Sequence, residues 1–490
     1  MTVSMSVIRQ VRLNALSETE ARLAAGEATA QLNFERAVLL DALGCDDDAR
    51  QCYLAALAVQ PDHAATLNGF GALLYRTGYH GAARTTYAQA IACHPEQPVG
   101  HVNLGNLLRE AGDLATARRH YEIALDLAPG FPEAHQGLGN VLAECGDAVG
   151  AEHHWKLGYR DRVLNTWPYR GPGQPIRVLM LVSVAHGNVP ARIFLDDRLF
   201  AVTTVAMEFY TPALTLPPHD LVLNAIGDAD LCGTALVAAT ALLDRTTAPV
   251  INHPAMVLKT GRARNADRLG KVPGVVTPRC TLLLREHLAG PDGARVLASG
   301  GFGWPVLLRA PGYHTGRHFV RVDTADDLSA AVAALPGAAV LAIEYLDATG
   351  DDGRSRKGRV LIVDRQLYPL HWAVSKNWKV HYFTAEMSDC ESHRAEEARF
   401  LSDMPAFLGQ RAVAALTAVA QRLGLDYGGI DFALGTDGQV IVFEANASMA
   451  IVPPSAEALW NYRRAAIDGA LLAAKNMLST RGGAIMVPAE

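Results

Sequence analysis

The stretch YGGIDFALGTDGQVIVFEANASM (427–449) decides how the second half of this chain folds. Two apolar runs, IDFAL and VIVFEA, flank the turn residues Gly435-Thr436-Asp437-Gly438. A glycine-containing turn between two such runs is a strong local signal for a β-hairpin. We therefore predict two antiparallel strands here.

Three oxygen-bearing side chains lie on this hairpin: Asp431 in its first strand, and Glu444 and Asn446 in its second. Residues two apart on a strand face the same way, so Glu444 and Asn446 share a face, and the hairpin brings Asp431 beside them. Two carboxylates and an amide oxygen suit a hard cation such as Mg²⁺. Two acidic residues on solvated strands would not explain Glu444, because the run VIVFEA is expected to be buried. A magnesium site with positions left for phosphate oxygens indicates a nucleotide site.

Composition excludes several classes of protein. The chain has 490 residues, half of them apolar and 19% charged, which indicates about three globular domains. A net charge of −6 gives no sign of nucleic-acid binding. The seven cysteines include no CxxC pair, which is typical of reduced thiols in a cytoplasmic protein. We find no signal peptide and no apolar run of the roughly 18 residues that span a membrane.

A repeat with a period of 34 residues begins near residue 30. Small residues, aromatic residues, turn glycines and closing prolines recur in register. The columns are Ala49, Ala83, Ala117 and Ala151; Tyr53, Tyr87, Tyr121 and Trp155; Gly44, Gly78, Gly112 and Gly146; Gly71, Gly105 and Gly139; and Pro61, Pro95 and Pro129. This pattern resembles the tetratricopeptide repeat and predicts an all-α solenoid of paired helices, with an N-terminal helix and four repeats over residues 1–163.

Such arrays form a concave groove that binds peptides or proteins. Asparagine and arginine side chains there would hold an extended peptide by its backbone and a carboxylate. The same residues would equally suit a solvated face, or a surface that docks on this chain's own second half. The candidate groove residues are Asn68, Arg76, Asn103, Asn106, Arg109, Gln136 and Asn140.

After a Pro/Gly-rich linker at 164–175 the pattern changes to strands and helices. Buried-strand runs at 176–184, 221–228 and 248–252, with helical stretches between them, predict a parallel sheet. The tip His186-Gly187-Asn188 follows the first strand and is a candidate to face substrate. Further expected elements are a strand pair at 305–322, a strand at 339–347, a hairpin at 359–374, helices at 408–424 and 455–478, and a loose tail at 479–490.

Residues 176–478 resemble the ATP-grasp fold of carboxylate–amine ligases such as D-alanine–D-alanine ligase and the glutamate-adding ligases. The sharpest likeness is the spacing of Asp431, Glu444 and Asn446, which matches the family's magnesium triad. The resemblance implies a β/α domain at 176–253 that precedes the ATP-grasp part. It also implies the central and C-terminal ATP-grasp subdomains at 254–478.

The resemblance further implies a set of ATP-binding residues. Arg262 and Arg309 would lie along the phosphates, and the loop of His314, Gly316 and Arg317 would close over the transferred group. The hinge Glu344-Tyr345-Leu346 would meet adenine and ribose, with Asp351 as a second ribose contact.

The sequence departs from the family pattern at its cations. Arg262 and Arg309 stand where lysine is usual, and Gly429 stands where peptide-forming members often carry an arginine. Candidates to supply that missing charge are Arg359, Lys376 and Lys379. His371 and His381 are candidate acid–base groups or substrate contacts, although a lone histidine is more often structural.

The combined hypothesis is a cytoplasmic ADP-forming ligase that uses ATP and Mg²⁺. It would phosphorylate an unknown carboxylate and pass the acyl group to an unknown amine, while the repeats recruit a peptide or protein. Two alternatives remain open: a non-catalytic nucleotide-binding scaffold, and a kinase-like enzyme that stops at phosphoryl transfer.

Overall fold

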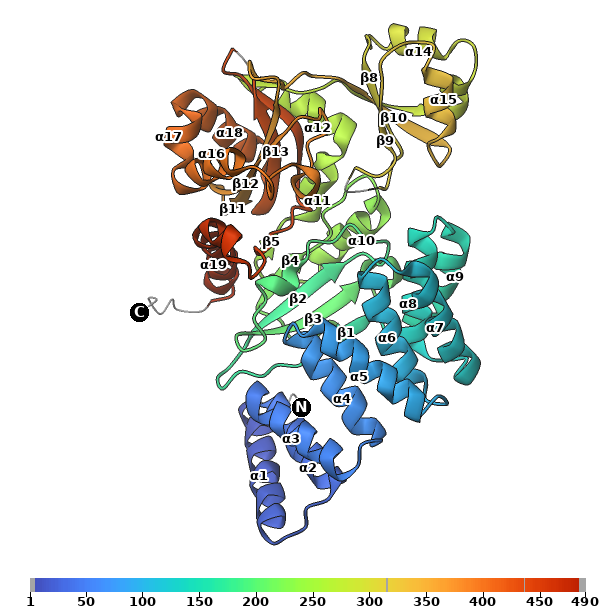
Figure 1. The fold of residues 1–490 in the computed structure, drawn as a ribbon, viewed down its shortest axis with the longest axis vertical. Helices are drawn as coiled ribbons and strands as arrows, with labels where there is room; N and C mark the ends of the chain where they lie inside the picture. The colour runs from blue at the N-terminus through green and yellow to red at the C-terminus, as the bar shows by residue number, and fades with distance from the viewer. Residues whose placement is uncertain (1–4, 314–315, 436, 484–490) are drawn as a thin grey trace. The chain divides into compact units, whose positions relative to one another are not determined.

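The computed structural model describes residues 5–313, 316–435 and 437–483 (Figure 1). His314, Thr436 of the predicted turn and residues 484–490 of the predicted tail lie outside the described residues. The chain divides into two compact units. Unit 1 comprises Met1–Met180 and Leu195–Asp220, and unit 2 comprises Leu181–Phe194 and Leu221–Glu490.

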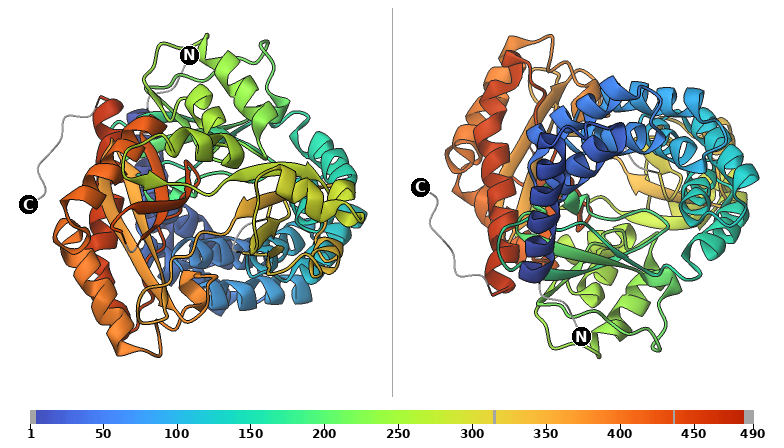
Figure 2. Two further views of the ribbon diagram at one scale, coloured as in Figure 1. Left: turned by 90° about the horizontal axis from the view of Figure 1, so that it is seen from above. Right: turned by 90° about the horizontal axis from the view of Figure 1, so that it is seen from below.

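Unit 1 begins with α1 (Met5–Ala24) and continues with four antiparallel helix pairs, which form an arc in the right-hand view of Figure 2. The predicted all-α repeat array is therefore confirmed. The pairs are α2 (Ala30–Ala42) with α3 (Asp46–Val59), α4 (Ala64–Arg76) with α5 (His80–Cys93), α6 (Pro98–Glu110) with α7 (Leu114–Leu127), and α8 (Pro132–Glu144) with α9 (Ala148–Tyr159).

Two glycine columns explain the repeat geometry. Gly78 ends α4 with a φ of +87°, a left-handed conformation that favours glycine. The amides of Gly78 and Tyr79 donate to the last carbonyls of α4 and so cap it. Gly71 serves a different purpose, because a Cβ at this position would overlap the ring of Tyr87 on α5. The repeat therefore needs glycine once for backbone conformation and once for close helix packing.

Every side chain that we predicted to line the groove bonds within unit 1. Arg76 pairs with Asp41 and Asp46 at 2.6 Å, and Arg109 pairs with Glu144 at 3.0 Å. The remaining bonds join Asn106 to Tyr121, Asn140 to Trp155, Gln136 to the carbonyl of Gly158, and Asn103 to Asn68. These side chains hold neighbouring helices together, which is a role that the sequence pattern did not predict.

The segment predicted as a linker is folded in the structure. It contains β1 (Leu164–Thr166), which pairs antiparallel with β3 (Phe200–Ala206). Arg170 in the same segment forms ion pairs with Asp41 and Asp197. The prediction of helix between the first two strand runs was wrong at β3, where the β-branched sequence FAVTTVA favours a strand.

The predicted strand at 176–184 is β2 (Ile176–Val182). Unit 2 then holds the parallel pair β4 (Leu221–Asn224) and β5 (Val250–Ile251), with α10 (Gly233–Leu243) between them in sequence. Two short helices follow, α11 (Pro254–Val257) and α12 (Arg262–Leu269).

A four-stranded antiparallel sheet comes next, in the order β7-β10-β8-β9. Three short helices pack on one of its faces through a buried core that includes Leu297, Leu308 and Val340. The strands are β7 (Cys280–Leu284), β8 (Val306–Arg309), β9 (Phe319–Val322) and β10 (Ala339–Glu344), and the helices are α13 (Arg285–Ala289), α14 (Gly293–Ser299) and α15 (Leu328–Ala333).

The largest sheet of unit 2 has the order β12-β11-β13-β14-β6. Both predicted hairpins are confirmed in it: β11 (Ser355–Val363) with β12 (Gln366–Ser375), and β13 (Tyr427–Leu434) with β14 (Val440–Asn446). The short strand β6 (Val275–Val276) pairs parallel to β14. The helices here are α16 (Glu391–Ser402), α17 (Met404–Leu408), α18 (Gln410–Leu423) and α19 (Arg464–Arg481).

The two faces of this sheet differ in chemistry. Trp372 packs against Phe400, Phe407 and Phe432, and so joins one face to α16 and α17. Strand alternation puts the neighbouring residues Arg359, His371 and Asp431 on the opposite face, where they lie in register across β12, β11 and β13. One face is thus an aromatic core, and the other carries charge.

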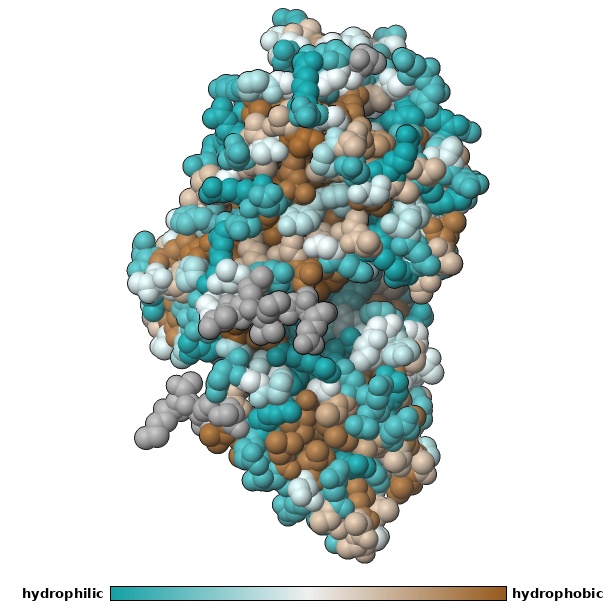
Figure 3. All heavy atoms as spheres, turned by 90° about the vertical axis from the view of Figure 1, so that its left-hand side faces the viewer, coloured by the Kyte–Doolittle hydropathy of each residue, from teal (hydrophilic) through white to brown (hydrophobic). Residues whose placement is uncertain are grey.

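Within the described part of the chain, no helix is long and apolar enough to cross a membrane. On the face drawn in Figure 3, apolar side chains form separate groups among hydrophilic ones.

The glycine at 71 allows a matched test of the repeat packing. Gly71→Ala should lower the free energy of unfolding by about 1–3 kcal/mol, because the added methyl group overlaps Tyr87. Gly81→Ala on α5 is the control, since a Cβ there meets nothing within 4 Å. Urea unfolding followed by circular dichroism measures both variants, and equal midpoints would contradict the packing role of Gly71.

Candidate functional site

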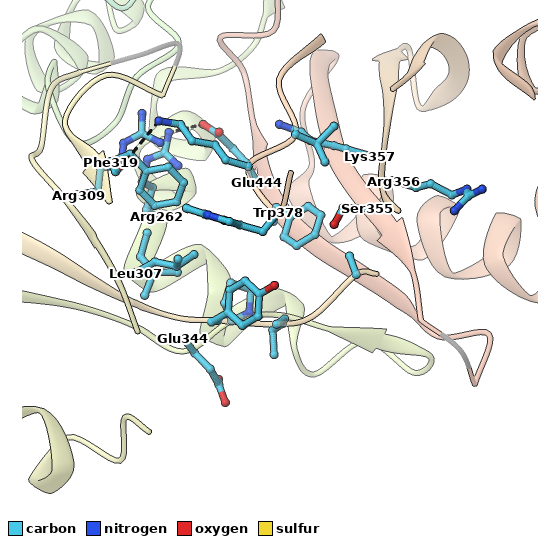
Figure 4. A pocket seen from close by; sticks show the side chains of 18 residues that line it. Arg262, Leu307, Arg309, Phe319, Glu344, Ser355, Arg356, Lys357, Trp378 and Glu444 are labelled. Atoms are coloured by element: carbon cyan, nitrogen blue, oxygen red, sulfur yellow. Dashed lines mark hydrogen bonds and ion pairs between the residues drawn. The ribbon is translucent and has the colours of Figure 1, made fainter. Parts of the chain in front are cut away.

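A cavity of about 850 Å³, including space open to solvent, lies between the β7-β10-β8-β9 sheet and the β12-β11-β13-β14-β6 sheet of unit 2 (Figure 4). This volume is in the range of small-molecule sites. Its lining comes from β8, β9, β10, β11 and β14, from Pro278 and the start of α12, and from the segments 344–348 and 378–380. Residues far apart in sequence therefore meet around one space.

Strand alternation explains which side chains of the smaller sheet reach the cavity. Val306 and Leu308 of β8 enter the core beneath α13–α15, so Leu307 and Arg309 emerge on the other face. The same alternation on β10 buries Ala342 and turns Ile343 toward the cavity. Strand β8 thus supplies the apolar side chain of Leu307 to the cavity and, at its last residue, the cationic side chain of Arg309.

Aromatic rings form part of the cavity wall. Phe319 and Tyr345 each make an edge contact with Trp378, with ring centroids 5.6 and 6.1 Å apart. Together with Leu307 and Ile343, these rings give a wall that suits a flat apolar group.

Cations gather at one end of the cavity. Figure 4 shows Arg262 and Arg309 beside Glu444, and Arg262 pairs with that carboxylate at 2.5 Å. Burial and then the charge of Arg262 lower the pKa of Arg309 to about 10. Burial and then Arg309 likewise lower the pKa of Lys379. The positive charges of Arg309 and Lys379 are therefore destabilised by their surroundings, and an anion bound in the cavity would stabilise them.

Asp431 lies on the charged face of the larger sheet and is only 1% exposed. Arg359 donates to its two carboxylate oxygens at 2.6 and 2.9 Å, and Lys357 lies 2.7 Å away. Burial alone would raise the pKa of Asp431, but Arg359 and Lys357 outweigh burial and hold that pKa far below its usual range. Asp431 is therefore ionised throughout the physiological pH range.

The three oxygen ligands predicted for Mg²⁺ lie on adjacent strands. Asp431 is opposite Glu444 in the β-ladder, and the amide of Asn446 donates to Glu444 at 2.7 Å. The Asn446 oxygen accepts from the backbone and hydroxyl groups of Ser448. Among the described residues, no three His, Cys, Asp or Glu side chains form a metal-ligand group, so a site here needs the amide as its third ligand. By residue type, two carboxylates and an amide oxygen suit a hard divalent cation, although in this structure Arg359 and Lys357 engage Asp431 and Ser448 engages the amide oxygen.

The remaining predicted residues divide between the cavity and other places. Glu344, Tyr345 and Leu346 line the cavity, although the Glu344 carboxylate accepts the backbone N–H of Arg279 and points away from the cations in Figure 4. Lys379 lines the cavity and donates to the carbonyl of Gly316. The exposed residues Arg317, Asp351 and Lys376 are not part of the cavity wall.

Sequence reasoning missed Lys357, Trp378 and Phe319, which all line the cavity. A signal for Lys357 exists in the run Ser-Arg-Lys-Gly-Arg (355–359). A strand that began at Ser355 would turn Lys357 and Arg359 to the same face. Because we predicted the hairpin to begin at residue 359, Lys357 lay outside the expected strand, and we did not predict that it shares a face with Arg359.

Comparisons with known proteins find similarity in both the helical and the α/β parts of the chain. A tetratricopeptide-repeat family model matches residues 86–119, and no curated protein sequence matches the chain. Among solved structures, the RimK domain protein ATP-grasp from Sphaerobacter thermophilus DSM 20745 is 17% identical, with 62% of this chain and 98% of that chain covered and a TM-score of 0.37. MamA 41-end from Desulfovibrio magneticus RS-1 is 20% identical, with 32% and 90% covered and a TM-score of 0.29. The chain is thus similar to tetratricopeptide-repeat proteins in its helical part and to an ATP-grasp protein in its α/β part.

The buried pairing of Asp431 predicts a large effect on stability. Asp431→Asn leaves Arg359 and Lys357 without the carboxylate that neutralises them, and should cost about 3–5 kcal/mol of unfolding free energy. Urea unfolding followed by tryptophan fluorescence reports this loss, because Trp372 is buried on the other face of the same sheet and contributes to the signal of the six tryptophans. Asp437→Asn, at an exposed position of the hairpin turn, is the control and should leave the midpoint unchanged. Equal midpoints for the two variants would contradict the pairing.

Proposed function

We propose that unit 2 is an ATP-dependent ligase that joins a carboxylate to an amine through an acyl phosphate. The observation that carries this proposal is the division of the cavity into an aromatic–apolar wall and a cationic end beside the carboxylate of Glu444. That division matches a nucleotide, which has a flat base at one end and a chain of phosphates at the other.

The base would lie against Leu307, Ile343 and Trp378, where the cavity is apolar. Its polar edge would meet the backbone of Tyr345 and Leu346, which leaves the β10 ladder at this point. The phosphates would then extend toward Arg309 and Arg262. Because Arg309 has a pKa lowered to about 10 by burial and by Arg262, a polyphosphate there would gain more than at an exposed arginine.

Asp431, Glu444 and Asn446 are the residues that would hold Mg²⁺. The ion would neutralise negative charge that develops on the phosphate oxygens. Arg262 already pairs with Glu444, so the same arginine is close enough to contact both the carboxylate and a neighbouring phosphate.

The proposed reaction has two steps. A substrate carboxylate oxygen attacks the γ-phosphorus of ATP, the bond to the β-phosphate oxygen breaks, and ADP leaves. The amine then attacks the acyl carbon, a C–N bond forms, and phosphate leaves with the electrons of the C–O bond while the nitrogen gives up a proton. Lys357 and Arg359 would hold the carboxylate and the tetrahedral intermediate, because both extend from β11 beside Asp431.

Arg359 offers a replacement for the charge that is missing at Gly429. A Cβ at Gly429 would overlap the side chain of Met449, so this position has no room for an arginine. Arg359 extends from the adjacent strand β11 and reaches the same face at Asp431. The charge required for acyl transfer would therefore come from a neighbouring strand.

The repeat array would recruit a peptide or protein substrate. Its predicted groove side chains are engaged within unit 1, so recognition would use their remaining hydrogen-bonding capacity or the exposed positions around them.

Glu444→Ala should lower Mg·ATP-dependent turnover by about 10²–10³-fold, because it removes a metal ligand and the partner of Arg262. The assay measures ADP release from the full chain over a panel of carboxylates and amines, with mass spectrometry for products that have lost water. Asp351→Ala is the control, since this exposed residue is not part of the cavity wall.

Full activity in Glu444→Ala would refute the site. A phosphorylated product whose formation does not depend on amine would favour the kinase alternative. Nucleotide binding without release of ADP for any substrate pair would favour the scaffold alternative.

A further inference from the structure

A second cavity of unit 2 opens on the other side of Lys357. It encloses about 930 Å³, including space open to solvent, and Lys357 lines both cavities. Its other walls come from Arg359 on β11, His371 on β12, the segment 450–455 and the start of α19. Lys357 therefore stands where a ligand in one cavity would meet a ligand in the other.

The charged side chains that we count around this cavity sum to one net positive charge. Lys357 and Arg359 share the one carboxylate of Asp431. Arg463 lies 3.4 Å from Glu397, which is fully buried and also accepts hydrogen bonds from Tyr382 and Tyr462. Three cations thus face two carboxylates. One anionic group of a ligand would be neutralised here, and a second would have no counter-charge.

Apart from the polar side chains of His381, Tyr382 and Ser455, the rest of the wall is largely apolar. Val452, Pro453 and Pro454 form one side, and Trp460 and Ile467 form another. These side chains offer contact area and no hydrogen-bonding groups except the indole N–H. A ligand that extends past the cations would therefore place an apolar or aromatic body against them.

His371 brings a buried polar atom without a hydrogen-bond partner to this cavity. His371 is 8% exposed, and its Nδ1 has no hydrogen-bond partner among the residues that the structure describes. A buried polar atom without a partner costs free energy unless a bound group or water satisfies it. Because His371 is opposite Arg359 in the ladder, a carboxylate held by Arg359 or Lys357 would bring its neighbouring polar groups to this atom.

We propose that the second cavity binds the carboxylate substrate, and that this substrate is a monocarboxylic acid with an apolar or aromatic side chain rather than a dicarboxylate. The inference rests on the proposed ligase function, because the bound carboxylate is the group that would be phosphorylated across Lys357. The single excess cation sets the charge of the ligand, and the wall of Val452, Pro454 and Trp460 sets its polarity.

The test measures binding by isothermal titration calorimetry on the full chain, with no turnover required. The probes are L-leucine, L-phenylalanine, L-glutamate and L-aspartate and their N-acetyl forms, each with and without a non-hydrolysable ATP analogue and Mg²⁺. We expect the apolar acids to bind at least about tenfold more tightly than the dicarboxylates.

Val452→Lys adds a cation at the partly exposed rim and should shift this preference toward the dicarboxylates by about tenfold. Leu459→Lys is the matched control, because Leu459 is similarly exposed and next to Trp460 but is not part of the wall.

Three results would overturn the inference: equal or tighter binding of the dicarboxylates, equal effects of the two lysine variants, or no binding of any acid. The proposed function fails separately. Apolar acids that bind without supporting ADP release would leave the inference standing and refute the ligase. ADP release with a dicarboxylate would refute the inference and support the ligase.

Discussion

The buried pairing of Asp431 with Arg359 and Lys357 is the interaction on which the rest of unit 2 depends. A carboxylate that is 1% exposed would be strongly destabilising without opposite charge beside it. Two cations from the neighbouring strand supply that charge, and they do so only if β11 and β13 keep their observed register. If one strand shifted by one residue, its side chains would turn to the aromatic face, and the carboxylate of Asp431 would be separated from the two cations. The ion pairs therefore fix the register, and the register positions both cavities.

The same constraint explains why the two cavities share a wall. Lys357 and Arg359 are two residues apart on one strand, so both side chains leave the same face. Lys357 lines the cavity with the aromatic wall, and both Lys357 and Arg359 line the cavity beside α19. In the proposed reaction, a strand that turns its charged face to two cavities would give the acceptor of the phosphoryl group a short path to the nucleotide.

Much of this arrangement could be predicted from sequence, because it depends on periodicity. Apolar alternation and a glycine turn predicted the hairpin at 427–449, and with it the meeting of Asp431 and Glu444. Where periodicity was misjudged, the prediction failed: FAVTTVA was taken for helix, and the start of β11 was placed too late to include Lys357. The positions of Asp351 and Lys376 could not be derived this way, because both lie outside the strands, where sequence separation does not fix the direction of a side chain.

The glycine at 429 shows why a residue-by-residue comparison with a family pattern is incomplete. Gly429 stands where peptide-forming members of the ligase family that the sequence resembles often carry an arginine, and this difference taken alone argues against the proposed acyl transfer. Yet Met449 fills the space that a side chain at 429 would need, and Arg359 delivers a guanidinium to Asp431 from the adjacent strand. Electrostatic stabilisation depends on where the charge lies and not on which strand carries it. The charged face of the sheet, rather than any single position of the motif, is therefore the unit that should be compared between proteins of this kind.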